Sequence, residues 1–350
     1  MNNKERDSQA ICDEAGQLFD SGNLEAAANQ YFLLVEDDIF APYAYYMLAD
    51  ISNRTGDPIT SKELYYKAFT IRPDLCKSLL SPECINYDYI FTGKKDFPLV
   101  ESCPLCGKQG EPIWCYPTLR LNSRHAQKHN PVRVWVYCND CHHIYAEEFP
   151  EHDISDTSTN IQSDCDYTTY PSRFSQFSKS LLKLSAYTFG QELLEVGLGG
   201  CECALTAREM GYNVLGIDIS DSCVSMAKKY GLEAQVQDFI DFCPGRQWDV
   251  IIFCDVIEHV SDPVLAIKKL YTLLKDDGVI LLSTPNFDSA FSSFSGHNDP
   301  MRLEVSHKNY FSRISLFSLL EQCGFRPMEY QVSDYYNGSM QIIIVKDVYK

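Results

Sequence analysis

Residues 192–218 read ELLEVGLGGCECALTAREMGYNVLGID, and this stretch decides the fold. Its apolar first residues predict a buried strand that breaks into a glycine-rich turn at Gly197. A helix is expected next, and then a second apolar strand that stops at Asp218. Strand, glycine turn, helix, strand and acid is the order found in the nucleotide-binding half of a doubly wound α/β sheet. Glycines let the backbone approach a ligand closely, and Asp218 is placed to bind a ribose diol.

The residues around the turn favour a nucleotide that carries a positive charge and no phosphate. A dinucleotide fingerprint G-x-G-x-x-G that starts at Gly197 would need glycine at position 202, where Glu202 would instead oppose a pyrophosphate. Glu195, two residues before the first glycine, is placed to meet an ammonium group. S-adenosylmethionine (SAM) has an ammonium group and a ribose and lacks phosphate. We therefore expect SAM as the cofactor; the alternative is a tight turn that binds no ligand.

The same residues resemble the motif of the class I SAM-dependent methyltransferases, E/D-x-G-x-G-x-G. Glu195, Gly197 and Gly199 stand in register with it, and Cys201 occupies the third glycine position. The resemblance runs over about residues 165–350, close to half of the chain. It implies a doubly wound, mostly parallel, seven-stranded Rossmann-like α/β sheet with strand order 3-2-1-4-5-7-6 and the last-but-one strand antiparallel.

The resemblance also implies the rest of the cofactor site. In the family, an acid at the end of the third strand accepts from the adenine amino group, and the next residue packs on the ring; Asp238 and Phe239 match these positions. Ile219, which follows Asp218, and Cys254, at the end of the fourth strand, complete the expected cofactor-binding residues. For Asp238 the alternative is a helix N-cap.

The residues after the fourth strand are candidates for the chemistry. The segment DVIEHVSDP at 255–263 resembles the D-V-x-E-H-V-x-D-P segment of the subgroup that includes the ubiquinone-biosynthesis O-methyltransferases, the type 23 methyltransferases. If the turn is helical, Asp255, Glu258 and His259 share one face at the edge where open α/β sheets hold their ligands. His259 with Glu258 would then act as a general base. In some relatives the matching trio binds a divalent cation, and in many the segment is only a structural turn.

His307 is the second candidate base. A long polar stretch, residues 287–305, leads into HKNYFS at 307–312, which resembles the family segment H-x-x-Y/H-F-S. The resemblance places this loop beside the acceptor pocket. The alternative is a histidine that caps a buried loop.

Two C-x-x-C pairs precede this region. Cys103 and Cys106 form the first pair and Cys138 and Cys141 the second, with 31 residues between the pairs. Four thiolates from two such turns bind one tetrahedral Zn²⁺ in zinc ribbons, and the alternating residues 132–137 predict a strand that enters the second turn. A structural Zn²⁺ is therefore expected. The alternatives are a redox-active pair or unliganded core cysteines.

The N-terminal residues 7–74 contain a helical repeat. Gly22 and Gly56 are 34 residues apart, and the same offset relates four pairs of expected core positions: Ala15 and Ala49, Ala27 and Ser61, Tyr31 and Tyr65, and Leu34 and Ala68. The pattern resembles two tetratricopeptide repeats, whose usual role is contact with a partner protein. A generic helical subdomain with a chance period is the alternative.

The expected organisation is thus a helical repeat unit at 1–75, a zinc-ribbon-like segment at 76–150, a linker and lid helix at 151–190, and the methyltransferase domain at 191–350. In the lead-in, Tyr167 and Tyr170 are candidate pocket walls.

Composition restricts the partners and the compartment. The chain has 350 residues, 45% hydrophobic and 22% charged, and a formal net charge of −18, which argues against nucleic acid as a partner. Neither a secretory signal nor a membrane-spanning stretch is visible. The fifteen cysteines are then expected to be mostly reduced thiols in the cytoplasm.

These features together predict methyl transfer from SAM to a small-molecule, sugar, glycan or partner-bound acceptor, with a hydroxyl as the expected methylated group (O-methylation). C-methylation of a sugar or natural product is one alternative. The other is a binding protein in which the repeats recruit a partner and the SAM fold is a degenerate scaffold.

Overall fold

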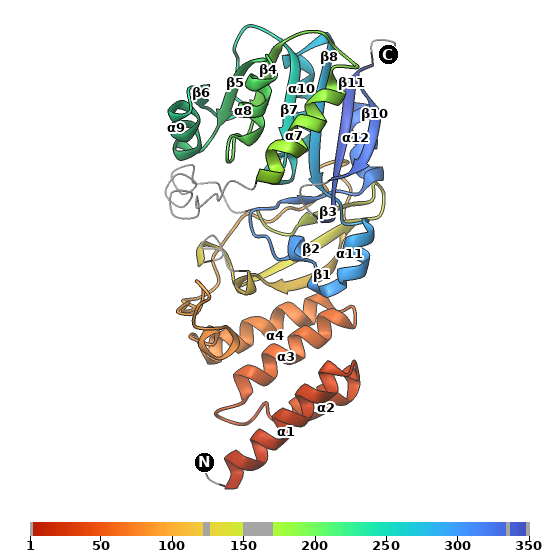
Figure 1. Ribbon diagram of the computed structural model, residues 1–350. Coiled ribbons are helices and arrows are strands. Elements are labelled where there is room, and N and C mark those ends of the chain that lie inside the picture. The colour runs from red at the N-terminus through yellow and green to blue at the C-terminus, as the bar shows by residue number, and fades with distance from the viewer. Residues whose placement is uncertain (1–2, 122–126, 150–170, 334–336, 348–350) are drawn as a thin grey trace.

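The computed structural model describes residues 3–121, 127–149, 171–333 and 337–347. Figure 1 shows three layers along the chain: paired helices at the N-terminal end, a small sheet in the middle, and a large sheet covered by helices at the C-terminal end. Tyr167 and Tyr170 lie outside the described residues. Among the described residues, no helix is both long and apolar enough to cross a membrane.

The N-terminal layer consists of two helical hairpins related by the predicted spacing. Their helices are α1 (Asn3–Asp20), α2 (Leu24–Phe32), α3 (Ala41–Arg54) and α4 (Pro58–Ile71). Gly22 and Gly56 turn the chain with φ of 82° and 89°. Asn23 and Asp57 then cap α2 and α4 with their side chains. All eight positions of the four predicted pairs are at most 1% exposed, so the 34-residue period is a repeat of the core.

The middle layer is a four-stranded antiparallel sheet, called the small sheet below. It contains β1 (Glu111–Pro117), β2 (Val132–Cys138), β3 (His143–Ala146) and β9 (Asn309–Tyr310), in that order. The short helix α5 (Cys76–Leu79) precedes it. β9 comes from the C-terminal part of the chain and pairs with β3. The segment expected at 76–150 therefore shares its sheet with the segment expected at 191–350.

The large sheet has seven strands in the order β10-β11-β8-β7-β4-β5-β6. Their bounds are β4 (Glu192–Val196), β5 (Asn213–Asp218), β6 (Glu233–Val236), β7 (Trp248–Cys254), β8 (Leu274–Pro285), β10 (Phe325–Val332) and β11 (Ser339–Lys346). β11 is antiparallel to both of its neighbours, and the other neighbouring strands are parallel. This is the order that the resemblance implied, in a mixed sheet.

Helices cover both faces of this sheet. They are α7 (Pro171–Leu184), α8 (Glu202–Glu209), α9 (Asp221–Lys229), α10 (Pro263–Leu273) and α12 (Arg313–Gln322), with the short α11 (Ala290–Ser295) outside the sheet. Adjacent strand residues point to opposite faces. Leu194 accordingly packs in the core beneath α10 and α12, and Leu193 packs in the core beneath α7 and α8.

Candidate functional site

Asp218 holds the glycine turn in place. Its Oδ2 accepts from the backbone N–H of Leu198 (2.8 Å) and of Gly199 (3.4 Å), and its Oδ1 accepts from Ser220 N–H (2.8 Å). Gly197 has φ of 81°, and a Cβ added there would lie 2.8 Å from Cγ2 of Val256. The turn at the end of β4 therefore packs against the chain that leaves β7.

Glu195 is the most unusual group of this turn. It is 4% exposed, and its Oε2 has no hydrogen-bond partner among the described residues. Burial raises the pKa of Glu195 well above its usual range, and the nearby carboxylates of Glu202 and Asp218 raise it further. Three acids around one spot favour a ligand that brings a positive charge. An ammonium group satisfies this need, so the residues present fit SAM.

Glu202 begins α8 and is 4% exposed, so its carboxylate occupies the place where a dinucleotide would bring a pyrophosphate. Arg173 of α7 forms an ion pair with it at 3.7 Å. Cys201, at the third glycine position of the motif, has φ of 66° and is fully buried. The chain thus keeps the left-handed backbone that the motif's glycine would allow, with a side chain attached.

The expected adenine end contains one cap and one core residue. Asp238 accepts from Ile240 N–H at its Oδ1 (2.7 Å), which makes it the cap of a turn, although no helix follows. Phe239 is 6% exposed and its ring lies 5.2 Å from that of Phe253, in the core of the sheet. Ile219 is half-buried beside Asp218.

The sequence analysis placed Asp255, Glu258 and His259 on one face only if the turn after β7 is helical, and this condition is not met at Asp255. Asp255 has φ of 55°, and a 3₁₀ turn covers only Ile257–His259. Because Asp255 stands outside this turn in a left-handed conformation, it does not share a helical face with Glu258 and His259. Its Oδ1 accepts from the hydroxyl of Ser283 (2.9 Å). Cys254, just before it, donates from Sγ to the carbonyl of Leu281 (3.9 Å).

His307 takes the place that Asp255 was expected to fill. Ligating atoms of Glu258, His259 and His307 all lie within 4.8 Å of one another, and the two imidazole rings meet edge to face with centroids 4.9 Å apart. Thr284, at the end of β8, donates to Oε2 of Glu258 (2.9 Å). Three of the predicted chemical residues are therefore together at one site, and Asp255 is beside it.

The two imidazoles are suited to accept a proton. His259 donates from Nδ1 to the carbonyl of Ser306 (3.1 Å), which leaves its Nε2 as the acceptor nitrogen. His307 is 7% exposed, and its Nδ1 has no partner among the described residues. Burial lowers the pKa of both histidines below the usual range, so both are neutral at physiological pH. Burial raises the pKa of Glu258 well above its usual range, and Asp255 adds to the shift.

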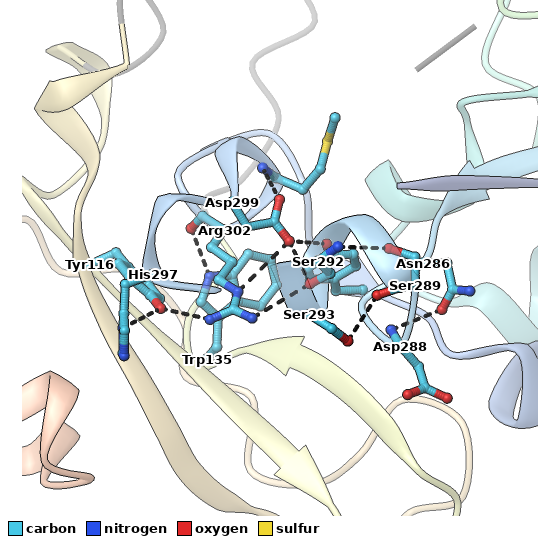
Figure 2. A network of polar contacts seen from close by, with 12 residues as sticks. Tyr116, Trp135, Asn286, Asp288, Ser289, Ser292, Ser293, His297, Asp299 and Arg302 are labelled. Atoms are coloured by element: carbon cyan, nitrogen blue, oxygen red, sulfur yellow. Dashed lines mark hydrogen bonds and ion pairs between the residues drawn. The ribbon is translucent and has the colours of Figure 1, made fainter. Parts of the chain in front are cut away.

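The polar stretch 287–305 docks on the small sheet (Figure 2). Tyr116 of β1 contacts Nδ1 of His297 (3.1 Å) and accepts from the guanidinium of Arg302 (2.9 Å). Trp135 of β2 donates from its indole to the carbonyl of Arg302 (2.9 Å). Asp299 accepts from the hydroxyl of Ser292 (2.6 Å) within the stretch itself. The expected loop is thus an ordered connector between the two sheets.

The four cysteines of the C-x-x-C pairs form one cluster. Their sulfur atoms all lie within 4.8 Å of one another, with 3.5 Å from Cys103 to Cys141 and from Cys106 to Cys138. Four Zn–S bonds of about 2.3 Å in a tetrahedron separate the sulfurs by about 3.8 Å, so the cluster has the size that Zn²⁺ requires.

The two turns that carry these cysteines also have the same backbone conformation. Gly107 N–H donates to the carbonyl of Cys103 (2.8 Å), and His142 N–H donates to that of Cys138 (2.9 Å). Gly107 and His142 both have left-handed φ, 71° and 55°. The chain has therefore built two matching turns whose thiols converge.

Comparison with known proteins assigns the class. A model of the methyltransferase domain matches residues 170–330. The ubiquinone biosynthesis O-methyltransferase of Actinobacillus pleuropneumoniae serotype 7 is 34% identical over 110 residues, which cover 28% of this chain and 47% of that one. The enzyme of the same name from Ruegeria sp. is 28% identical over 163 residues, 42% of this chain and 65% of that one. The chain thus spans about half the length of the first relative.

Among solved structures, the magnesium protoporphyrin IX methyltransferase from Synechocystis PCC 6803 with bound SAM aligns with a TM-score of 0.44 at 15% identity. The alignment covers 56% of this chain and 98% of that one. The family match identifies residues 170–330 as a methyltransferase domain, and the strand order of the large sheet is the one that the resemblance implied.

Two residues of the site had no signal in the sequence. Thr284 lies at the C-terminal edge of the sheet, and this position was the only sign of its role beside Glu258. Arg133 of β2 donates to the carbonyls of Val305 and His307 across the interface with the small sheet. A contact over so many residues follows from the packing of the two sheets.

Proposed function

We propose that the protein transfers the methyl group of SAM to a hydroxyl of a small-molecule, sugar or partner-bound acceptor. The observation that carries this proposal is the buried carboxylate of Glu195, whose Oε2 has no hydrogen-bond partner among the described residues and which lies beside a glycine turn held by Asp218. The match to the methyltransferase domain and the O-methyltransferase activity named for its relatives support it.

In this proposal each residue of the glycine turn has a distinct task. SAM, when bound, supplies an electrophilic methyl group on a sulfonium sulfur. Glu195 neutralises the ammonium group, and the carboxylate oxygens of Asp218 keep lone pairs for the ribose hydroxyls. Asp238 and Phe239 serve the adenine end, with Ile219 and Cys254 as further cofactor contacts. The main contribution of the chain is to position the two reactants.

The acceptor side contains the proposed base. Neutral His259 offers its Nε2, and neutral His307 lies against it, so either removes the proton of the acceptor hydroxyl. Burial raises the pKa of Glu258 and so favours its protonated form, and its Oε2 accepts a hydrogen bond from Thr284. A divalent cation held by Glu258, His259 and His307 is the second way to activate a hydroxyl, and the proximity of their ligating atoms favours it.

Calorimetry tests the cofactor part. SAM should release heat with the wild type and with Asp221→Ala, a matched control in the first turn of α9, and should not with Asp218→Ala. A wild type that gives no heat with either SAM or S-adenosylhomocysteine would favour the degenerate scaffold and refute the proposal. Circular dichroism shows whether Asp218→Ala remains folded.

Transfer of radiolabelled methyl from SAM to a panel of phenols, sugars and metabolite extracts tests the reaction. His259→Ala and His307→Ala should each lower the rate of an acceptor at least tenfold. Loss of the rate with a chelator, and its return with one divalent cation, would assign activation to the cation. Label on carbon would replace O-methylation by C-methylation.

The two other parts are assigned as proposals as well. Cys103, Cys106, Cys138 and Cys141 are proposed to hold one structural Zn²⁺, because the cluster has no open ligand position for catalysis. The hairpins α1–α4 are proposed to be tetratricopeptide-like and to contact a partner protein, which the repeated core supports.

A further inference from the structure

The segment 305–312 contains the proposed base His307 and is contacted both by the small sheet and by the turn after β7. In sequence it lies between β8 and α12, two elements of the methyltransferase domain. Its place in the chain would assign it to the large sheet. Its hydrogen bonds assign it to the interface between the two sheets.

Arg133 is the central contact. Its side chain is on β2, is 5% exposed, and donates through its two terminal nitrogens to the backbone carbonyls of Val305 and His307. The guanidinium also lies over the ring of Trp135, 4.8 Å from its centroid. Burial of a charged side chain costs free energy unless hydrogen bonds or an opposite charge compensate for the lost water. We therefore take the two hydrogen bonds to the segment as the structural role of this arginine. Its two hydrogen bonds hold the backbone carbonyls of Val305 and His307 in position.

The rest of the segment is tied to the same sheet residue by residue. Ala146 N–H donates to the carbonyl of Lys308 (2.9 Å). His143 and Asn309 are joined through their side chains (3.0 Å), and β9 then pairs with β3. The hydroxyl of Ser312 donates to the carbonyl of His142 (2.8 Å), the residue that follows the last cysteine of the cluster.

The opposite side of the segment holds the catalytic turn. Lys308 N–H donates to the carbonyl of Glu258 (2.7 Å), and the amide of Asn309 donates to the carbonyl of Val260 (2.7 Å). The segment is therefore clamped between the small sheet and the turn after β7. Moving it would separate His307 from Glu258 and His259 at the same time.

We propose that the small sheet positions the acceptor side of the active site, with Arg133 as the positioning residue for His307. The proposal rests on the proposed function, because it takes His307 as an acceptor-side group. The cysteine cluster takes part through β3 and His142. Loss of the proposed Zn²⁺ from the cluster should then increase the mobility of His307 and leave the glycine turn intact.

The test compares Arg133→Met and Arg133→Lys with a matched control, Arg120→Met. Arg120 also belongs to the small-sheet region, but it contacts Tyr46 (2.9 Å) and Asp50 (3.7 Å) of α3 and not the segment. Hydrogen–deuterium exchange of amides 306–310 and carbethoxylation of His307 by diethylpyrocarbonate are measured by mass spectrometry. Affinity for SAM is measured by calorimetry.

Arg133→Met should raise exchange at 306–310 and the labelling rate of His307 at least tenfold, with SAM affinity within twofold of the wild type. Arg133→Lys, which keeps one donor, should be intermediate, and Arg120→Met should match the wild type. With an acceptor in hand, the turnover number of Arg133→Met should fall at least tenfold at an unchanged KM for SAM.

Wild-type exchange and labelling in Arg133→Met would overturn the proposal, and so would an equal loss of SAM binding, since the effect would then be general unfolding. If Arg133→Met does not fold, Arg133→Lys and the wild type treated with a strong chelator give the same comparison. A wild type that binds no SAM refutes the proposed function alone, because exchange and labelling need neither cofactor nor turnover.

Discussion

At the scale of a single residue, we expect Glu195 to make cofactor binding depend on pH. Its carboxyl is buried beside Glu202 and Asp218, and these surroundings raise its pKa well above the usual range. The free protein therefore carries a proton on this group at a pH where an exposed glutamate is ionised. An ammonium ligand needs the ionised form, so its binding expels the proton.

We expect SAM affinity to rise with pH through the raised pKa of Glu195 and to fall as pH decreases, because protons then compete with the ammonium group. Calorimetry in two buffers of different ionisation enthalpy should show proton release in the wild type. Glu195→Gln should weaken binding and abolish the buffer dependence. Glu192→Gln, on the same strand and paired with the exposed Arg246, is the control and should behave as the wild type. Equal heats in both buffers for the wild type would contradict this reasoning.

Cys201 combines a side chain with a left-handed backbone. A non-glycine residue in this conformation costs about 1–2 kcal/mol, and burial of a small apolar side chain returns about the same amount. We expect Cys201→Gly to change the free energy of unfolding by less than about 1 kcal/mol, because relief of strain offsets lost packing. Cys201→Val should lower it by more than about 2 kcal/mol, since a β-branched residue adds strain and volume. Urea unfolding measures both; a large loss in the glycine variant would show that packing dominates.

The residues of the glycine turn were open to prediction because their partners are close in sequence. Glu195 and Asp218 lie on two consecutive strands, Gly197 lies in the turn after the first, and a short motif captures their geometry. Arg133 could not be found in this way, because its partners are backbone carbonyls more than a hundred residues away, and any residue type supplies a carbonyl.

At the scale of elements, the sequence anticipated the convergence of the two cysteine turns but not the conformation of the turn after β7. Spacing alone placed the four sulfurs together, because each C-x-x-C pair fixes its own turn. For the turn after β7, the expected grouping of Asp255 with Glu258 and His259 on one helical face did not hold. Asp255 takes a left-handed conformation, which sequence periodicity does not reveal. His307 then fills the place beside Glu258 from a distant loop.

The cysteine cluster predicts a specific metal content. The purified wild type should contain one equivalent of zinc, and Cys138→Ser should lose it, because only three thiolates remain at a four-ligand site. Cys243→Ser changes an exposed cysteine outside the cluster and should keep the metal. Elemental analysis by mass spectrometry decides the matter. Full retention of zinc by Cys138→Ser would refute the proposal that these four cysteines bind it.

At the scale of the whole molecule, the helical repeats and the small sheet form one apolar core. Val132 and Val134 of β2 belong to the same buried cluster as Tyr65 of α4, and Lys62 of α4 pairs with Glu147 just after β3. The methyltransferase domain is joined to the small sheet by β9 and Arg133. Three of the four parts expected from the sequence, the repeats, the small sheet and the methyltransferase domain, are therefore in continuous contact. Their boundaries were the least predictable feature, because β9 comes from the C-terminal part of the chain and pairs with β3 of the small sheet.

Two truncations should differ sharply for this reason. Removal of residues 1–37 takes away α1 and α2, which pack on α3, and should leave SAM affinity within about twofold of the wild type. Removal of residues 1–74 uncovers the apolar face of β1 and β2 and should lower the melting temperature by more than about 5 °C, because a loss of 1 kcal/mol already costs about 2–4 °C. Scanning calorimetry and SAM titration measure both. Equal melting temperatures for the two truncations would show that the repeats add nothing to the core.

The late strand β9 also sets a timetable for biosynthesis. β3 ends at Ala146 and its partner begins at Asn309, so a ribosome adding about 5–20 residues per second delivers the partner on the order of ten seconds later. During that interval the nascent chain carries an open strand edge, which other chains can pair with. The cysteine cluster can close early, whereas the acceptor side must wait for His307, which follows β8 in the chain. A cell that translates slowly would therefore prolong the period in which this protein is most prone to aggregate.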